Sequence, residues 1–487
     1  MAQGWEDAAS AAGVSSRRRF LTGGTAVGAA ALWSRIATSG APSAPPAPRP
    51  RPAARQSFAA PRPADVTLVD AGGWCWFTEA RTLITPAGRL YAGSVAHGTG
   101  TSRDGAVEVT SVDVRGGLHP LRPVRRSTIG HHAPNDHTNP GLEVTSDGGV
   151  LAMWSGHVED LLLRRARDPK GTGVFGALAP IERPLAGRSP GRAVAYGSVH
   201  RLAALGVTIV AYRGEQYSWN LMRSPDDGLT WEPLGLLLVP PSVGQRPYAK
   251  FASDGRRLWF ACTEGHPRTV QPTNIRVGMV DADGSVTDAS DTHLGRTGSG
   301  VPVAAVPLAF RTPARAAAWI SEIRIIDGAP VVSVSLRGAR VDDAAGAWPH
   351  DHLRVVRDRD GGWIHELVAH GGGELGANPI ERDYSGLAAL DPSTPDRVVV
   401  ATNVQPRTGE PLRSRADGRV HLELWQMDRR SDGSAQWVAT ALTTDSREDN
   451  MRPHIAVRNG LKVLSWMRGR YHSPNRFATR IVVRQAS

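Results

Sequence analysis

The sequence has very little cysteine and very little lysine. Its 487 residues contain only two cysteines, Cys75 and Cys262, which excludes a small fold held together by a disulfide framework. Only three of the 57 Lys plus Arg residues are lysine, so arginine supplies nearly all of the positive charge behind a net charge of +11. So uniform an arginine bias indicates genome composition more than a nucleic-acid surface. The chain is 40% hydrophobic, which is enough for a sizeable core.

The N-terminal region resembles a twin-arginine export signal. Residues 16–22 read Ser-Arg-Arg-Arg-Phe-Leu-Thr, and a mildly apolar segment rich in Ala and Gly follows as far as Leu32. That segment is too short and too weakly apolar to span a membrane. We therefore predict a signal peptide over residues 1–40, with the twin-arginine translocase as its partner. The predicted location is secreted, either extracellular or periplasmic, with no membrane association beyond export.

A Pro/Ala-rich linker is predicted over residues 41–65, because that composition cannot pack into a core. Residues 1–65 carry eight arginines against Glu6, Asp7 and Asp65, a net charge of +5. This leaves +6 of the total +11 for all the residues that follow. The overall charge therefore gives no reason to expect a nucleic-acid partner.

One short pattern recurs from residue 66 onward: a tight turn, often with Asp-Gly, followed by alternating apolar residues. Such alternation after a turn predicts a half-buried strand of a hairpin. The pattern occurs seven times, at residues 86–93, 146–156, 204–214, 253–265, 326–338, 395–403 and 458–469. Long helical periodicity is absent. Seven such units predict an all-β fold, a seven-bladed β-propeller spanning residues 66–487.

A second pattern supports the same fold. Ser224, Asp226, Gly228, Thr230 and Trp231 have the spacing of an Asp-box turn. In that turn the Asp carboxylate accepts hydrogen bonds from backbone N–H groups, Gly takes an unusual backbone angle, and Trp packs beneath the hairpin. Such turns lie at blade hairpins away from the central site, so we predict a structural role for this one.

Candidate site residues lie where the predicted strands of a blade begin and end. His137 precedes one predicted strand, and His157 follows the next. Antiparallel neighbours bring these two positions to the same edge of the blade. Tyr196 and Arg213 repeat the arrangement in the following blade. We predict that all four side chains meet at one rim; the alternative is that the two histidines are loop residues that only fix the backbone.

More polar and aromatic residues follow at the same predicted rim. Trp219 and Asn220 come a few residues later, and the fourth blade opens with Arg246, Tyr248 and Lys250. Arginine pairs with a carboxylate through two parallel hydrogen bonds, and an aromatic ring, here Trp219, can stack on a pyranose face. These groups suit an acidic sugar. They also suit β-elimination, which needs a base for the proton α to a uronate carboxylate, a cation for the enolate-like intermediate and an acid for the leaving oxygen.

Nine short segments carry a family resemblance. They are GGWCWF (72–77), NDHTNP (135–140), WSGH (154–157), YRG with a following WN (212–220), RPYAKFASDG (246–255), TEGHPR (263–268), YSGLAALDP (384–392), NMRPHI (450–455) and SWMRGRY (465–471). In this order they resemble the BNR-repeat family of seven-bladed propellers that includes the ulvan lyases. The resemblance implies an active-site cleft on one face. It also implies metal-independent β-elimination of a polysaccharide containing glucuronate or iduronate.

The resemblance also implies roles for individual residues. His137 and Tyr196 correspond to the acid/base groups, His157 to the histidine beside them, and Arg213 to the arginine that neutralises the carboxylate. Asn139 joins the predicted substrate-binding residues. The sequence departs from the family pattern on either side of His137 and directly after Tyr196. Two other interpretations stay open: a glycoside hydrolase of the same shape, rhamnosidase- or sialidase-like, and a non-catalytic sugar-binding propeller.

Cys262 and His266 are candidate ligands of a structural zinc ion, which some of the resembled lyases carry. His365 and His370 are candidates for the remaining ligands. The alternative is a strand cysteine beside a loop histidine. No cofactor is predicted for catalysis. We expect a monomer. We also expect both cysteines to be free, because Cys75 and Cys262 fall in different predicted blades, too far apart for a disulfide.

Overall fold

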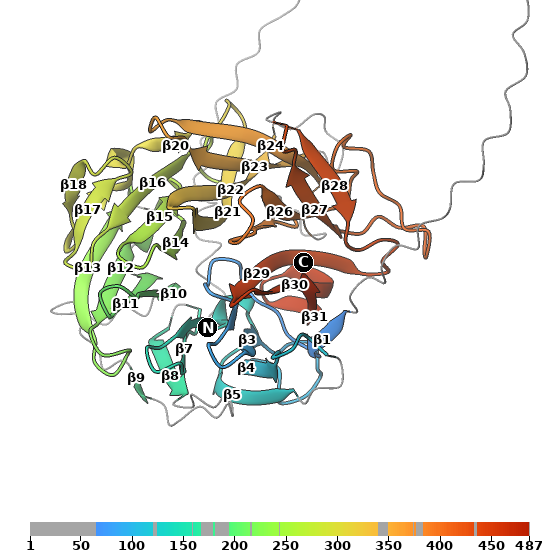
Figure 1. Ribbon diagram of the computed structural model, residues 1–487, viewed down its shortest axis with the longest axis horizontal. Coiled ribbons are helices and arrows are strands. Elements are labelled where there is room, and N and C mark those ends of the chain that lie inside the picture. The colour runs from blue at the N-terminus through green and yellow to red at the C-terminus, as the bar shows by residue number, and fades with distance from the viewer. Residues whose placement is uncertain are drawn as a thin grey trace, which may run out of the picture. The chain divides into compact units, whose positions relative to one another are not determined.

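Each of the seven recurring patterns forms the second strand of an antiparallel sheet. In the computed structural model these seven sheets, or blades, stand around a common axis (Figure 1). The prediction of an all-β, seven-bladed propeller is confirmed. The structure describes residues 65–119, 124–157, 159–166, 179–180, 194–214, 217–242, 244–338, 349–373, 375, 383–432 and 436–486.

The predicted signal peptide over residues 1–40 lies outside the described residues, as does the predicted linker up to residue 64. Within the part of the chain that is described, no helix has both the length and the apolar character needed to cross a membrane.

The blades are numbered 1 to 7 in chain order, and the strands of each blade are counted from the axis outward. The innermost strands are β2 (Thr82–Ile84), β6 (Gly141–Val144), β10 (Ala195–Leu202), β14 (Ala249–Ser253), β21 (Ala317–Ile326), β25 (Ala388–Leu390) and β29 (Asp449–Arg458). The second strands are β3 (Arg89–Val95), β7 (Val150–Ser155), β11 (Val207–Arg213), β15 (Leu258–Cys262), β22 (Ala329–Arg337), β26 (Arg397–Thr402) and β30 (Leu461–Ser473). The third strands are β4 (Ala106–Asp113), β8 (Leu161–Ala166), β12 (Trp219–Ser224), β16 (Ile275–Val280), β23 (His350–Arg357), β27 (Glu423–Arg429) and β31 (Arg476–Ala486). The fourth strands are β5 (Arg125–His131), β9 (Ala179–Pro180), β13 (Glu232–Val239), β17 (Ser285–Asp288), β24 (Trp363–Gly372), β28 (Trp437–Ala441) and β1 (Val66–Val69).

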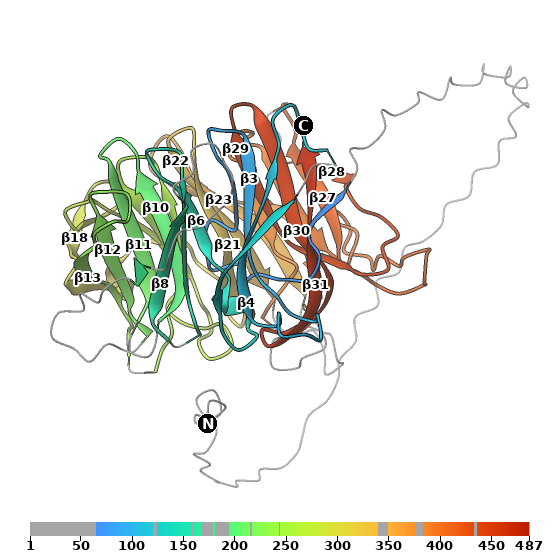
Figure 2. The same ribbon diagram turned by 90° about the horizontal axis from the view of Figure 1, so that it is seen from below.

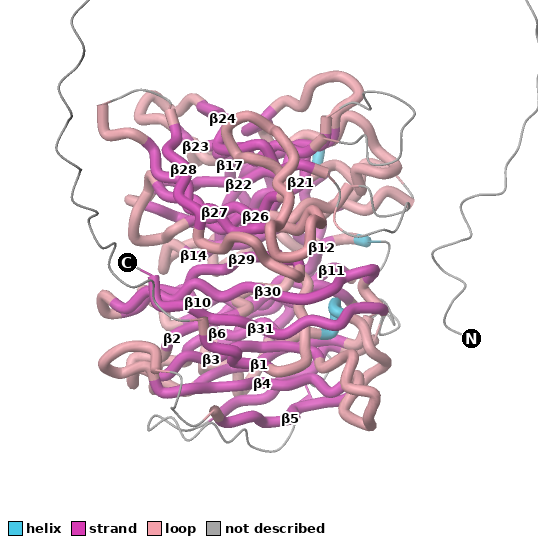
Figure 3. The backbone as a smooth tube through the Cα atoms, turned by 90° about the vertical axis from the view of Figure 1, so that its right-hand side faces the viewer, coloured by secondary structure: helices cyan, strands magenta, loops and turns pink. Residues whose placement is uncertain are grey.

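Blades 3 and 4 carry additions that the repeat pattern does not predict. Strand β18 (His293–Arg296) extends blade 4, β19 (Ser299–Pro302) pairs in parallel with β13 of blade 3, and β20 (Leu308–Phe310) pairs with β16. The described helices are single turns, η1 (Asp136–Thr138) and η3 (Val303–Ala305), seen as short cyan segments among the magenta strands of Figure 3.

The ring closes by pairing the two ends of the described chain. Strand β1 lies antiparallel to β31, with Val66 opposite Val483, so the first strand completes the seventh blade. Figure 1 shows β1 next to β31, and Figure 2 shows the propeller turned by 90°, with β31 beside β30. A closed ring leaves no unpaired blade at either end of the chain, which avoids an exposed sheet face there.

The core lies between the blades. Every residue of β7 is buried, so the expectation of half-buried strands is wrong for this strand. Alternate residues of β7 face opposite neighbours: Val150, Ala152 and Trp154 pack toward blade 1, while Leu151 and Met153 pack toward blade 3. Period-two alternation here divides the apolar side chains between two interfaces, because both faces of a blade are covered.

The segment 72–79, which we call the axial loop, fills the space between the innermost strands on one face. The backbone N–H of Cys75 donates to Oδ1 of Asn139 at 2.9 Å, and that of Glu79 donates to the hydroxyl of Ser198 at 3.3 Å. Trp74, Cys75 and Phe77 are buried. Cys75 and Cys262 are free thiols, as expected, but Cys75 belongs to this loop and shares a hydrophobic cluster with Cys262.

The Asp-box sequence forms the turn predicted for it, in the β12–β13 hairpin. Oδ1 of Asp226 accepts from the backbone N–H groups of Leu229 and Thr230 at 3.1 and 2.8 Å. Gly228 has a φ of 86°, a left-handed conformation that favours glycine. The hairpin lies at the opposite end of blade 3 from Arg213, because the β11–β12 register pairs Arg213 with Trp219 and Thr208 with Ser224.

Candidate functional site

The strand register brings the four predicted catalytic residues to one rim. Ala195, at the start of β10, pairs with Arg213 at the end of β11, so Tyr196 and Arg213 lie at the same end of blade 3. His137 sits on η1 just before β6, and His157 follows β7. The ring centroids of His137 and His157 are 4.7 Å apart, and those of His137 and Tyr196 are 5.1 Å apart.

The hydrogen bonds of His137 fix its tautomer. Its Nδ1 bonds to Oδ1 of Asn135 at 2.8 Å and lies 2.7 Å from Oδ1 of Asp136. Oδ1 of Asn135 also accepts from the backbone N–H of His137, so both neighbours of Nδ1 are acceptors and Nδ1 carries the proton. Nε2 therefore presents a lone pair to the hydroxyl of Tyr196, which donates to it at 2.9 Å.

Asp136 is held as a carboxylate beneath His137. It is 1% exposed, and its Oδ2 accepts from Nη1 of Arg452 and from the hydroxyl of Tyr471, both at 2.7 Å. Burial alone would raise the pKa of this carboxyl, but the Arg452 guanidinium and the contacts with His137 hold it well below its usual range. The buried chain of contacts thus runs from Arg452 and Tyr471 through Asp136 and His137 to Tyr196.

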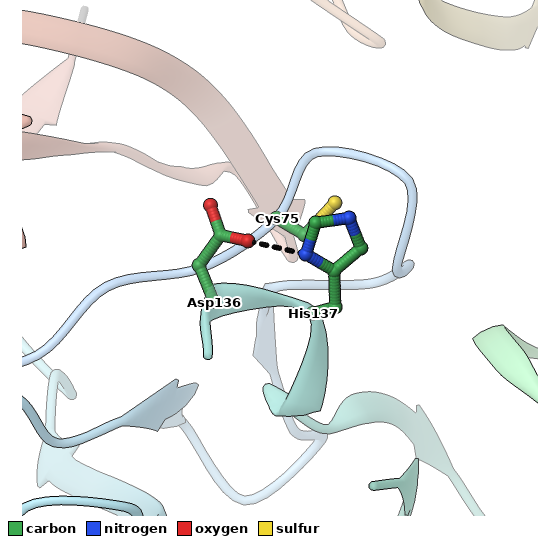
Figure 4. A group of neighbouring side chains, drawn as sticks. All are labelled: Cys75, Asp136 and His137. Carbon is green, nitrogen blue, oxygen red and sulfur yellow. Dashed lines mark ion pairs between the residues drawn. The ribbon is translucent and has the colours of Figure 1, made fainter. Parts of the chain in front are cut away.

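Cys75, Asp136 and His137 form the one three-residue group in the described chain whose ligand atoms could hold a metal ion, and Figure 4 shows the three side chains together. Burial raises the pKa of the Cys75 thiol to about 12, so the thiol keeps its proton at neutral pH. The Asp136 carboxylate is already bonded to Arg452. The guanidinium therefore supplies the positive charge that a metal would bring.

Tyr196 and Arg452 share an unusual backbone conformation. Their φ angles are 56° and 51°, in the left-handed region, and each lies at an irregularity in the register of an innermost strand. Such bulges re-aim a side chain out of the regular alternation of a strand. Here they place the phenol of Tyr196 and the guanidinium of Arg452 on opposite sides of the Asp136–His137 pair.

The Tyr196 phenol is surrounded by rings and by the Arg213 guanidinium. The guanidinium lies 4.4 Å from the centroid of the Tyr196 ring and 4.9 Å from that of Tyr248. Burial raises the pKa of Tyr196 well above its usual value, so the phenol is neutral at rest. Nη1 of Arg213 is buried with no hydrogen-bond partner among the described residues, so its donor capacity is unused there.

His157 is neutral throughout the physiological range. Burial lowers its pKa to about 3, and the neighbouring His137 and Arg213 act in the same direction. Beside the His137–Tyr196 pair it therefore adds an uncharged imidazole and no second positive charge.

Four predicted substrate-binding residues require correction. Trp219 is fully buried against Phe251 and donates through its ring N–H to the carbonyl of Pro247 at 3.0 Å, so it offers no face to a sugar. Lys250 is 1% exposed and forms an ion pair with Glu79 at the axis.

The two asparagines have internal roles as well. Asn139 is 1% exposed and holds the axial loop through its bond to the backbone of Cys75. The Asn220 amide is largely buried and donates to the carbonyl of Ser218 at 3.0 Å. All four polar or aromatic groups satisfy interior contacts, which a sequence pattern cannot distinguish from a surface position.

The other two predicted binding residues lie at the site. Tyr248 is buried beside Arg213, and the Arg246 guanidinium lies 4.5 Å from the centroid of the half-buried Tyr217 ring. Of the six predicted binding side chains, Arg246 is the one that remains partly open to solvent.

The geometry gives no support to zinc at Cys262 and His266. Neither belongs to a group of three ligand residues within the described chain. Cys262 is fully buried, and burial raises the pKa of its thiol. His266 accepts at Nδ1 from the backbone N–H of Arg268 at 3.0 Å. His365 contacts the Phe310 ring, and His370 bonds to Asp351 at 2.8 Å, both away from this pair.

Sequence reasoning assigned no role to several residues of the site. Asp136, Arg452 and Tyr471 form the support of His137, Cys75 lies beside it, and Tyr217 stacks with Arg246. The first four lie inside segments that carried the family resemblance. The available signal was that the segments around Asp136, Arg452 and Tyr471 each contain polar residues near the end of a strand.

No family model matches the chain, and no curated protein matches it in sequence. Among solved structures, a PL25 ulvan lyase bound to a GlcA(1-4)Rha3S unit aligns over 86% of this chain and 95% of its own, with a TM-score of 0.58 and 12% identity. The polysaccharide lyase Uly1 aligns over 87% of this chain and 99% of its own, with a TM-score of 0.54 and 8% identity. A GH93 α-L-arabinofuranosidase of Fusarium graminearum covers 71% of this chain and 91% of its own at 10% identity, but its TM-score of 0.42 is too low to bear on fold or function. At these identities the likeness to the two lyases shows a shared propeller fold.

Proposed function

We propose that this protein is a polysaccharide lyase that cleaves a glucuronate- or iduronate-containing polysaccharide by β-elimination. The observation that carries the proposal is the 2.9 Å hydrogen bond between His137 and Tyr196, with the Arg213 guanidinium 4.4 Å from the same phenol ring. A proton-transfer pair next to a carboxylate-binding cation is what elimination α to a uronate carboxylate needs.

In the proposed reaction Arg213 binds the uronate carboxylate and stabilises the negative charge that develops on it. The oxygen of Tyr196 takes the proton from the carbon α to that carboxylate while the phenol passes its own proton to Nε2 of His137. The C–O bond to the leaving sugar breaks as the carbon–carbon double bond forms. The proton then returns from His137 through Tyr196 to the leaving oxygen, so no proton is lost or gained overall.

Asp136 contributes by stabilising the proton-carrying state of His137. When Nε2 accepts a proton, the imidazolium lies 2.7 Å from Oδ1 of Asp136, whose charge Arg452 and Tyr471 hold in place. His157 stays neutral beside it and does not oppose the positive charge on His137. Asp136, Arg452 and Tyr471 are buried, and the low dielectric constant around them strengthens the electrostatic contacts that they make.

Two further features support this assignment. The ulvan lyase with the similar fold was solved with a GlcA(1-4)Rha3S unit bound, which contains a glucuronate. The complete Asp-box turn in blade 3 is consistent with the BNR-repeat family, which we propose for this chain. We also propose export through the twin-arginine pathway, on the basis of residues 16–22, which lie outside the described residues.

The test is to incubate the purified protein with ulvan and with other glucuronate- or iduronate-bearing polysaccharides and to follow the ultraviolet absorbance of unsaturated uronate. We expect product with at least one of them, and a loss of roughly 10²- to 10⁴-fold in kcat for Tyr196→Phe and His137→Ala. A suitable control is His370→Ala, because His370 lies in blade 5 with Asp351 and outside the site.

The outcomes separate the three interpretations. No unsaturated product from any uronate polysaccharide, or full activity of His137→Ala, would refute the lyase. Shorter chains without unsaturated product would indicate hydrolysis, which would need a pair of carboxylates at working separation. Binding without cleavage that survives both substitutions would indicate a non-catalytic propeller.

A further inference from the structure

The ring of Tyr217 contacts two arginines at the rim of the proposed site. Its centroid lies 4.5 Å from the Arg246 guanidinium and 5.4 Å from the Arg213 guanidinium. Tyr217 and Arg246 are half-buried, whereas Arg213 is buried. One ring therefore joins an arginine at the end of β11 in blade 3 to an arginine that precedes β14 in blade 4.

The loop between β11 and β12 holds this ring in place. The backbone N–H of Gly214 donates to the carbonyl of Ser218 at 2.8 Å, and the Asn220 amide donates to the same carbonyl at 3.0 Å. A Cβ at position 214 would lie 2.7 Å from Nδ2 of Asn220, so a side chain there would displace the amide. Tyr217 has a φ of 61°, in the left-handed region that a tyrosine rarely adopts. Backbone of this kind persists where the surrounding structure holds it, and it is frequent at ligand sites.

An arginine that stacks on an aromatic ring keeps its hydrogen-bond donors available. The N–H groups lie in the plane of the guanidinium, so an anion can bind at the edge while the ring holds the face. The contact with Tyr217 leaves Arg246 partly open to solvent. On Arg213, the unused donor is Nη1. Both arginines can therefore donate to a ligand without giving up their contact with the ring.

The charge of Arg246 reaches the inside of the site. Burial lowers the pKa of His157 to about 3, and the nearby groups that act in the same direction are His137, Arg213 and Arg246. The ring of His157 lies 4.7 Å from that of His137. Arg246 is therefore near enough to the proposed proton-transfer pair to act on a charge that develops beside it.

The proposed reaction creates a second negative charge on the substrate. The uronate carboxylate carries one negative charge at rest. When the α-proton leaves for the oxygen of Tyr196, the electron pair of the broken C–H bond moves onto the carboxylate group and gives an enolate-like dianion. Two guanidinium groups match this dianion, whereas one matches the resting carboxylate. A second cation therefore contributes most in the transition state, where it raises kcat.

We propose that Tyr217 is a positioning residue, which holds the Arg246 guanidinium beside that of Arg213 so that both bind the carboxylate of one uronate. This inference rests on the proposed function and deepens it, because it gives the second charge of the intermediate its own arginine. The hydroxyl of Tyr217 is not required, because the face of the ring supplies the contact with each cation.

The test is calorimetric titration of the full chain carrying Tyr196→Phe, so that ligands are bound and not cleaved. One ligand is a uronate oligosaccharide of several sugars, and the other is the same oligosaccharide with its carboxyl groups reduced to primary alcohols. Tyr217→Leu in this background should raise Kd for the uronate ligand by about 10-fold and leave Kd for the reduced ligand unchanged. Tyr217→Phe keeps the ring and should bind both ligands as the parent does.

The link between ring and arginine is tested by a double variant. Arg246→Gln should also raise Kd for the uronate ligand alone. Tyr217→Leu and Arg246→Gln remove the same contact, so their combined effect on Kd should be smaller than the product of the two single effects. With Tyr196 intact, each substitution should lower kcat as well as raise KM, because the dianion forms only during the reaction.

Matched controls lie at the opposite ends of the same two blades. Trp231→Leu removes a half-buried aromatic ring in the β12–β13 hairpin of blade 3. Arg256→Gln removes an exposed arginine in the β14–β15 hairpin of blade 4. Neither substitution should change Kd for either ligand.

Four results would overturn the positioning role of Tyr217. They are an unchanged Kd in Tyr217→Leu, an equal effect of Tyr217→Leu on both ligands, an equal loss in Tyr217→Phe, and a double variant whose Kd equals the product of the single effects. The lyase assay is separate: carboxylate-specific binding that depends on Tyr217, without unsaturated product, keeps the arginine pair and refutes the lyase. Unsaturated product with a Kd that ignores Tyr217 does the reverse.

Discussion

Asp136→Asn tests the buried support of the site most directly. The substitution keeps the shape of the side chain and removes a negative charge that faces Arg452 at 2.7 Å, with both side chains 1% exposed. Removing one partner of a buried ion pair leaves an uncompensated charge, which lowers the free energy of unfolding by about 3–5 kcal/mol. The substitution should therefore lower both stability and activity.

The effect on activity follows from the tautomer of His137. An asparagine that presents its oxygen to Arg452 turns its NH₂ group toward Nδ1, which disfavours the Nδ1–H form and also removes the charge that stabilises the imidazolium. We expect kcat to fall roughly 10²- to 10⁴-fold, the full contribution of a general acid–base pair. KM should change little, because Asp136 does not face the substrate.

Unfolding in denaturant and initial rates of unsaturated-product formation measure the two effects. Asp147→Asn is the matched control: Asp147 pairs with Arg165 at 2.8 Å in the same blade, but it is 47% exposed, so the loss should stay within about 1 kcal/mol. An Asp136→Asn protein with near-normal stability, or with kcat within a few-fold of the parent, would refute the role assigned to the buried chain of contacts.

Three further predictions concern other parts of the structure. Trp219→Ala should lower the free energy of unfolding by about 3–5 kcal/mol, measured in denaturant, because the ring is fully buried; a binding defect without destabilisation would contradict this. Burial lowers the pKa of His352 to about 4, so the unfolded chain takes up its proton near pH 6.5 and the folded protein does not. As the pH is lowered from 6.5 to 4, the contribution of His352 to stability should therefore fall by about 1.4 kcal/mol per pH unit, and in thermal melts across that range His352→Gln should lose less stability than the parent protein. Arg213→Lys keeps the charge but loses the planar fork, so KM for uronate oligosaccharides should rise by about 10-fold.

The fold could be predicted because its signal repeats. Each second strand is preceded by a turn and shows alternation, and seven independent copies constrain one another. Closure through β1 could not be predicted, because its four residues carry no turn signal and their partner lies at the other end of the chain. The extra strands β18 and β19 could not be predicted either, because neither is repeated in the other blades.

The site could be predicted only where strand order determines position. His137, His157, Tyr196 and Arg213 meet because antiparallel pairing forces strand ends together. Trp219 was assigned wrongly, because the pattern gives its place at the strand end but not the direction of its side chain. Asp136 is adjacent to His137 in the chain, yet its role depends on Arg452 and Tyr471 from blade 7, a contact that no local pattern contains.

The pairing of β1 with β31 determines the order in which the protein can assemble. During synthesis residues 66–69 appear among the first of the propeller, yet their partners at residues 481–483 appear among the last. Joining them closes a loop of more than 400 residues, at an entropic cost of about 5 kcal/mol by polymer scaling. Until β31 has been synthesised, β1 therefore has no strand to pair with and the ring of blades cannot close. A chain cut short before β31 would keep six blades and the β29–β30 hairpin that carries Arg452 and Tyr471, yet β1 would have no strand to pair with and the ring would stay open.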